Sequence, residues 1–258
     1  MCCFSGPVRT VQSTKIFARM SARGGLFSQA RQTLVYEMKI AADAAVAMIL
    51  PIPTPARSAD DAVRFVSLER YDDFFSDVER AFPPPAAAFG PPSRGPQAIS
   101  GAAPPLVVHS VGAFVASFVP SVADFARLDA RFRIPEGTID RVPEYADWGF
   151  AVFQLQTSGP GLARIHPMAF EFPTRRPKEL FFPTVHVHDG ALHPEADFAH
   201  ALYAQGLAAS PEWWNPGVRL GQVMKADRTE GLVDLEGTVA SKSLVGRRPN
   251  RDEWARLG

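Results

Sequence analysis

The sequence predicts an α+β fold made mostly of antiparallel β-sheet, with a few short peripheral helices. Two observations lead to this class. Short segments of alternating polar and apolar residues recur along the chain, as in strands with one buried face. Most of these segments are joined by turn residues, whereas the helical crossovers that a parallel sheet needs are rare. We therefore expect hairpin-type connections and no doubly wound parallel sheet.

The first part of the chain contains four candidate strands and one candidate helix. Alternation or apolar runs predict strands over 15–19, 33–40, 45–52 and 63–68. The segment 45–52 is apolar on both faces, which is typical of a central strand, and it ends in prolines that cannot continue a ladder. Aromatic residues and a valine at helical spacing predict a helix over 71–82.

A segment rich in proline, glycine and alanine divides the sequence. Residues 83–105 read PPPAAAFGPPSRGPQAISGAAPP, show no hydrophobic period and offer few backbone donors, so we expect a loop. The residues before this loop are too few to build a stable core alone. We therefore expect residues 1–258 to form a single domain in which both sides of the loop share a core.

The second part of the chain continues the β-rich pattern. We expect, in order, a β-type run at 106–119, a short helix at 121–128, a hairpin of strands 149–156 and 163–172, a strand at 182–188, a weak helix at 196–206, and irregular structure with a polar C-terminus beyond Ser210. The residues between the two hairpin strands include Thr-Ser-Gly-Pro-Gly, which supplies glycines for a turn.

Two segments share one pattern. Residues 32–56 and 149–177 each contain an alternating strand, a short break and a second strand that ends in prolines. This indicates either a weak internal duplication of strand pairs or the ordinary similarity of short strands, and the patterns are too short to decide.

Four motifs occur in an order that resembles a known family. They are CCFS at the start, AMILPIPTP, VVHSVGAFVASFV, and the pair DWGFAVFQLQ and IHPMAFEFPT. Together they resemble an uncharacterised bacterial family, a domain of unknown function, over most of residues 1–185. Its typical members are exported or membrane-attached and carry a signal segment before the N-terminal Cys. This sequence departs from that pattern because no signal segment precedes its Cys pair. The resemblance implies no activity.

Composition narrows the classes of partner. Lys plus Arg and Asp plus Glu both number 27, so the formal charge is zero and the basic excess of a nucleic-acid-binding protein is missing. No apolar run is long enough for a membrane span or a signal segment. The two cysteines, Cys2 and Cys3, are adjacent and form no disulfide framework. We therefore expect a cytoplasmic protein that binds no nucleic acid and does not span a membrane.

The segment FFPTVHVHDGALHP predicts a candidate metal site. Residues two apart on a strand face the same side, so His186 and His188 are expected to share a face and to hold one cation. Imidazole suits Zn and other first-row transition metals. Candidates for a third ligand are Asp189 and His193, just past the strand end, and His166, His109 and His200 elsewhere, and the sequence does not choose among them. The alternative is that these histidines occupy the solvated face of an edge strand.

Cys2 is a candidate nucleophile. Removal of Met1 exposes the Cys2 amine, which can act as a base toward its own thiol, as in N-terminal nucleophile hydrolases. The Met-Cys start resembles glutamine amidotransferases of that class, but Cys3 stands where they have glycine, so their residue roles are not carried over. A cysteine can instead join the histidines as a thiolate ligand. The simplest alternative is a structural cysteine pair.

No complete catalytic constellation emerges from these residues. The sequence contains no nucleophile elbow, Walker A loop or dinucleotide-binding glycine motif. We therefore expect a β-rich binding or interaction module whose partner is a small molecule or a protein. The alternatives are a metal-binding protein or metal-dependent enzyme built on His186 and His188, and a hydrolase that uses Cys2. Trp213 and Trp214 are a candidate aromatic platform or, more simply, pack a loop onto the core.

Overall fold

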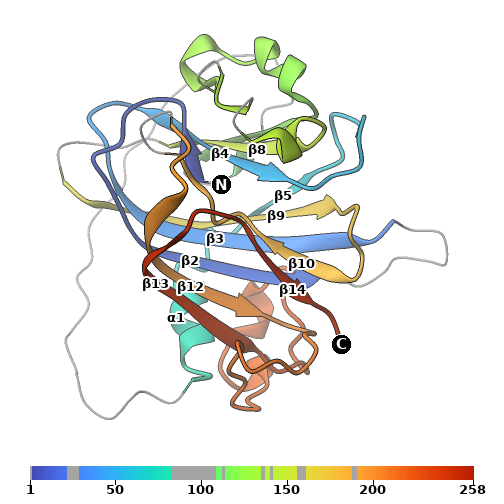
Figure 1. The fold of residues 1–258 in the computed structure, drawn as a ribbon. Coiled ribbons are helices and arrows are strands. Elements are labelled where there is room, and N and C mark those ends of the chain that lie inside the picture. The colour runs from blue at the N-terminus through green and yellow to red at the C-terminus, as the bar shows by residue number, and fades with distance from the viewer. Residues whose placement is uncertain are drawn as a thin grey trace.

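Two large sheets and a small one make up the described part of the protein (Figure 1). The structure is a computed structural model that describes residues 2–21, 29–82, 109–111, 114–134, 137–139, 142–155, 161–187 and 191–258. The expected loop at 83–105 and the expected ligand His188 lie outside these residues. No helix in the described ranges is long and apolar enough to cross a membrane.

The first sheet, sheet A, is mixed but mostly antiparallel. Its strand order is β11 (His186–Val187), β1 (Cys2–Phe4), β4 (Val46–Ile52), β8 (Gly149–Leu155), β7 (Phe114–Val119) and β6 (His109–Val111). Only β1 and β11 pair in parallel within this sheet. Every residue of β4 is buried, as its two apolar faces predict.

The second sheet, sheet B, lies against the first. Its strand order is β13 (Ala240–Pro249), β12 (Glu195–Ala204), β2 (Thr10–Met20), β3 (Arg31–Ala41), β9 (Ala163–Pro173) and β5 (Arg64–Ser67). A small antiparallel pair, β10 (Glu179–Phe182) and β14 (Glu253–Arg256), completes the β-structure. The expected strands at 15–19, 33–40, 45–52, 63–68, 149–156 and 163–172 are therefore confirmed, with shifted bounds.

Three hydrophobic clusters pack between and outside the two large sheets. The largest lies between the sheets, where Met48 and Leu50 of β4 meet Tyr36 and Phe170 of sheet B. A second cluster lies on the other face of sheet A, where it contains Ala47 and Ile49 of β4. Three short 3-10 helices cover this cluster, namely η1 (Val122–Arg127), η2 (Ala130–Phe132) and η4 (Pro143–Tyr145). The clusters contain residues from both sides of 83–105, so the N-terminal part shares its core with the rest.

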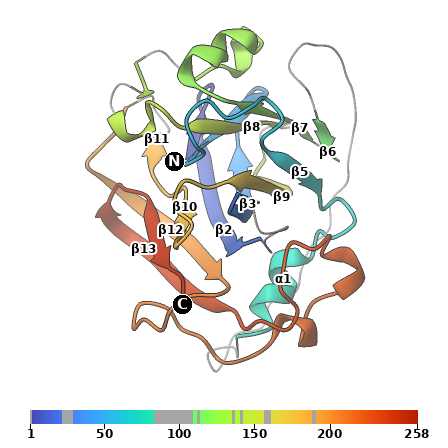
Figure 2. The same cartoon turned by 90° about the vertical axis from the view of Figure 1, so that its right-hand side faces the viewer.

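A third cluster covers the outer face of sheet B. Here α1 (Phe74–Glu79) packs beside a segment that contains η5 (Leu220–Gln222) and η6 (Ala226–Arg228) (Figure 2). The helices of the described chain are thus short, as expected. Each helix in the described ranges has six residues or fewer. The described part of the protein is therefore predominantly β, and its helical content is smaller than an α+β fold implies.

Four expectations about individual elements are wrong. The helix expected over 196–206 is instead strand β12 as far as Ala204, because alternate residues such as Phe198 and Leu202 face the core with period two. The region beyond 210 contains β13 and β14. The expected hairpin is split, since β8 belongs to sheet A and β9 to sheet B. The strand expected at 182–188 is interrupted at 183–185, where Pro183 cannot donate to a ladder.

Candidate functional site

Two imidazoles meet at the edge of the space between the sheets. The Nε2 atoms of His186 and His200 lie 3.3 Å apart. The ring of His186 stacks on Phe198 with centroids 4.5 Å apart and an interplanar angle of 25°. His200 is 5% exposed, and His186 is half-buried. The pair is therefore shielded but can be approached from the His186 side.

Three strands position this pair. His200 lies on β12 between Phe198 and Leu202, which belong to the cluster between the sheets. His186 begins β11, where its backbone N–H donates to Asn250 Oδ1 at 2.7 Å and its carbonyl accepts from Asn250 Nδ2 at 2.9 Å. The parallel register of β1 and β11 pairs Cys2 with His186. Figure 2 shows the N-terminus beside β11. The N-terminal strand thus runs directly beside this imidazole pair.

Of the other expected ligands, Asp189 and the side chain of His109 lie outside the described part of the chain, as His188 does, whereas His166 and His193 lie within it. His166 lies on β9, where its ring contacts Phe114 at a centroid distance of 3.9 Å. Burial lowers the pKa of His166, which favours the neutral ring. His193 is exposed, and its carbonyl accepts a hydrogen bond from Asn250. The described residues contain no group of three or more His, Cys, Asp or Glu side chains placed to hold a metal.

Of the two cysteines, the structure describes the side chain of Cys3 alone. Cys3 is buried among Ile49, Val185 and Val187, on the side of sheet A that faces the 3-10 turns. The side chain of Cys2 lies outside the described atoms, so its expected role as a nucleophile stays a prediction. His200, which sequence reasoning treated only as one of several further ligands, is the histidine that the fold brings to His186.

A groove runs past the C-terminal end of β12. Its first half has a volume of about 680 Å³ and is lined by Trp213, Trp214 and Asn215, among others. Its second half, of about 850 Å³, is lined by residues that include Arg19 and Leu257. The two halves share Gln205, Gly206 and Asp234, so they adjoin.

Gln205 fixes the floor where the two halves meet. Its side chain is almost fully buried, donates to the carbonyls of Asp234 at 2.8 Å and Gly237 at 3.2 Å, and accepts from the backbone N–H of Asp234 at 2.9 Å. The Gln205 amide therefore uses both its NH2 group and its carbonyl oxygen in hydrogen bonds to the 234–237 turn. The turn is held to β12, which makes the floor a preformed surface.

Trp214 lines one of the two hollows, and Arg19 lines the other. Trp214 is 52% exposed, and its backbone is bridged to Ser241 while its ring lies 5.4 Å from that of Phe82. Arg19 is 9% exposed, and its Nε donates to the carbonyl of Met20 at 3.1 Å. Burial lowers the pKa of Arg19, and attraction to Asp234 and Glu171 partly offsets this.

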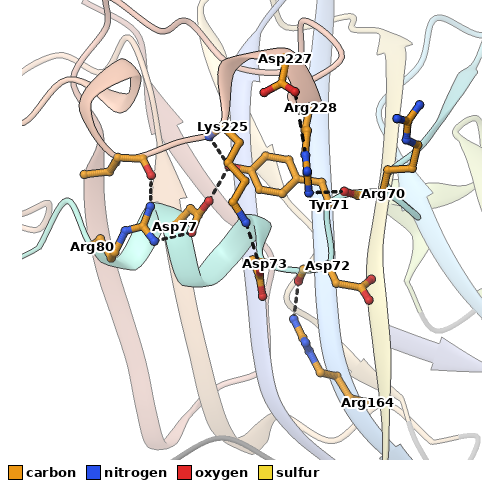
Figure 3. Close-up of polar contacts among 11 residues, drawn as sticks. Arg70, Tyr71, Asp72, Asp73, Asp77, Arg80, Arg164, Lys225, Asp227 and Arg228 are labelled. Carbon is orange, nitrogen blue, oxygen red and sulfur yellow. Dashed lines mark hydrogen bonds and ion pairs between the residues drawn. The ribbon is translucent and has the colours of Figure 1, made fainter. Parts of the chain in front are cut away.

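A second polar cluster joins α1 to the segment around η6 (Figure 3). The Tyr71 hydroxyl donates to Asp77 at 2.8 Å and accepts from the Lys225 backbone N–H at 2.9 Å. Arg80 pairs with the same carboxylate at 2.8 Å, and the ammonium of Lys225 pairs with Asp73 at 3.1 Å. Tyr71 and Asp77 are both 1% exposed. Donors and acceptors match within this cluster, so it connects elements and leaves little room for a ligand.

Comparisons with known proteins give only a distant likeness. No family model matches the chain, and no curated protein sequence matches it. Among solved structures, the chain is similar to the crystal structure of baculovirus P35, with 12% identity and a TM-score of 0.48 over 99% of each chain. It is also similar to the crystal structure of the caspase-8/P35 complex, with the same identity and TM-score over 95% of this chain and 96% of that one. At 12% identity and this TM-score, the likeness assigns no function.

Proposed function

We propose that the protein is a non-catalytic binding module that holds an extended polypeptide segment of a partner protein in the groove beside β12. One observation carries the proposal, namely that two hollows share lining residues around the hydrogen-bonded Gln205, and that Trp214 lines one hollow and Arg19 the other. Each hollow alone has the size of a small-molecule site, about 300–1,000 Å³. A ligand that fills both must be long.

The chemistry of the two ends defines the ligand further. The exposed face of Trp214 suits an aromatic or proline side chain, since tryptophan supplies a large apolar area at a low entropic cost. The guanidinium of Arg19 suits an Asp or Glu side chain. Tryptophan and arginine are enriched among the interface residues that supply most of the binding free energy. We therefore expect a segment with an acidic residue and an aromatic residue or proline.

A peptide array tests this proposal. Its members pair one Asp or Glu with one Trp, Tyr, Phe or Pro at varied spacing, and the affinity of each binding peptide is then measured by fluorescence polarisation. Trp214→Ala and Arg19→Met should each weaken binding at least about tenfold. Val245→Ala, which removes an exposed apolar side chain from β13, and Arg70→Met, which removes an exposed charge, are the matched controls and should bind normally.

Either of two outcomes would contradict the proposal. The array can yield no peptide that depends on its acidic residue, or the four variants can bind equally well. Melting temperatures of all four variants accompany the binding data, so that loss of folding is separated from loss of the groove.

A further inference from the structure

Sheet B ends at β13, and the outer edge of this strand is open. β13 pairs with β12 on one side, in an antiparallel register that is unbroken from Ala240 to Pro249. It stands last in the strand order of the sheet, and Figure 2 shows its other side at the outside of the molecule. A long open edge is a template on which another chain can add a strand.

Ser241 shows which backbone groups of β13 point outward. Its N–H donates to the Trp214 carbonyl at 2.8 Å, and its carbonyl accepts from the Trp214 N–H at 2.9 Å, so both groups face away from β12. Because these directions alternate along an antiparallel strand, the backbone groups of Ser243, Val245 and Arg247 also face outward. Within the described chain, no acceptor meets the outward N–H groups of these three residues. The edge can therefore pair, and the fold already uses its first position at Ser241.

Cations line this edge, since β13 contains Lys242, Arg247 and Arg248 and no acidic residue. Lys242 is neutralised by two glutamates. The side chain of Arg247 is 72% exposed and reaches Glu195 through Nε alone. Nε of Arg248 donates to the outward carbonyl of Val245 at 3.1 Å, which holds this guanidinium at the edge. The terminal nitrogens of both arginines have no partner among the described residues, so they can meet an incoming carboxylate.

The same charges discriminate between possible strands. If two copies of the chain paired antiparallel about Val245, Lys242 of one copy would lie opposite Arg248 of the other. Like charges directly opposite each other destabilise a sheet, so β13 is protected against pairing with itself. A strand that carries Asp or Glu opposite Arg247 and Arg248 meets complementary charge instead.

We propose that the outer edge of β13, from Ser243 to Arg248, binds an acidic extended segment of a partner protein as an additional antiparallel strand of sheet B. Backbone hydrogen bonds supply the affinity, and the two arginines supply the selectivity. The antiparallel direction follows the pairings that β13 already makes with β12 and with Trp214. The Val245 carbonyl has a second lone pair, so it can accept from the added strand while Arg248 holds the first. These residues do not line the groove, so this site does not depend on the binding function proposed above.

A labelled peptide, Glu-Glu-Thr-Ile-Thr-Val, tests the charge recognition by fluorescence polarisation with the full chain. In the antiparallel register its first two residues lie opposite Arg248 and Arg247. We expect saturable one-to-one binding that weakens as salt is added. Arg247→Gln combined with Arg248→Gln should weaken binding about fivefold, the usual effect of two cross-strand charge pairs. Arg131→Gln is the matched control, because the Arg131 side chain is 74% exposed and also pairs with a carboxylate, and it should bind as the parent does.

Backbone methylation of the peptide tests the strand pairing without any change to the protein. The amide of the peptide isoleucine faces Val245 in this register, whereas the amide of the next threonine faces solvent. Methylation of the isoleucine nitrogen should therefore abolish binding, and methylation of the threonine nitrogen should leave it nearly unchanged. Amide hydrogen exchange should also slow at Ser243, Val245 and Arg247 when the parent peptide is added.

Four outcomes would overturn the assignment. Absence of saturable binding by the acidic peptide means that the cations only protect the edge. Equal binding of a peptide with lysine in place of both glutamates removes charge recognition. Equal affinities of the two methylated peptides remove strand pairing. A peptide that is weakened by Trp214→Ala and not by the double arginine variant binds in the groove, which separates this site from the function proposed above. Melting temperatures of all variants exclude loss of folding as the cause.

Discussion

The polar cluster at α1 and the imidazole pair at β11 are both shielded from water, but they are built on opposite principles. Around Tyr71 and Asp77, every donor meets a complementary acceptor, and the charges of Arg80 and Lys225 reach solvent. Between His186 and His200, the two Nε2 atoms lie 3.3 Å apart, so one ring donates a hydrogen bond and the other accepts it. The cluster at α1 joins formal charges through several elements, whereas the imidazoles meet in a hydrogen bond whose donor depends on the tautomer of each ring.

Removal of Asp77 should give the largest effect. Asp77→Ala leaves the buried Tyr71 hydroxyl without its acceptor and Arg80 without its partner, so we expect a loss of about 2–3 kcal/mol in the free energy of unfolding. Urea denaturation near neutral pH measures this loss. Asp77→Asn, which can still accept from Tyr71, should lose less. A loss below about 0.5 kcal/mol, the range of ordinary surface substitutions, would show that the cluster does not fasten α1.

Glu171 extends the comparison, because it is a partly buried carboxylate with several hydrogen-bond donors, and its contribution to the free energy of unfolding can be measured as a function of pH. Ser21, Thr33 and Arg64 all donate to it. Burial alone would raise the pKa of Glu171, but the contacts with Arg64 and the two hydroxyls outweigh burial and lower the pKa below its ordinary value.

The direction of this shift sets the pH dependence. A folded-state pKa below the unfolded value means that Glu171 contributes stability above about pH 4.3, and that this contribution is lost as the pH falls through the folded-state pKa. Glu171→Gln should therefore lose about 1 kcal/mol near neutral pH and less in acid. Urea denaturation at both pH values checks this. An equal loss at the two values would mean that the carboxylate charge is irrelevant.

The imidazole pair should give the smallest effect on stability. Replacing both partners of a buried polar contact by apolar groups of similar shape is nearly neutral, so His186→Phe with His200→Leu should change the free energy of unfolding by less than about 1 kcal/mol. His186→Phe also preserves the stacking on Phe198. Urea denaturation measures the change. A loss as large as that of Asp77→Ala would remove the contrast between the two regions.

The strands with strong internal patterns were predictable from the sequence. β4 is apolar on both faces and lies centrally in sheet A. β3 is a strand as expected, but its alternation predicted one solvated face, whereas only Lys39 of β3 is exposed because hydrophobic clusters cover both sides of sheet B. β12 was mistaken for a weak helix because four of its residues are alanine, a residue that favours helices, and its alternation becomes visible only when Phe198, His200 and Leu202 face one core. β13 was missed because an edge strand with mostly exposed residues carries little hydrophobic period.

The candidate site was predictable only in part. The pattern on one strand identified His186, but His200 reaches it from a strand of the other sheet, and no local spacing encodes such a meeting. The aromatic end of the groove was noticed from the pair Trp213 and Trp214. Arg19 gave no signal, because a single arginine in a strand is ordinary until the fold buries it.

The placement of β1 has a consequence for how the protein folds during synthesis. Cys2 pairs with His186, and β2 pairs in parallel with β12, which ends at Ala204. Contacts between residues so far apart in sequence slow folding, because the intervening chain must first be ordered. A nascent chain that has emerged only as far as β9 therefore presents β1 and the outer side of β2 as unpaired strand edges. Such edges are prone to pair with other chains, so the interval before β11 and β12 leave the ribosome is when we expect this protein to depend most on chaperones.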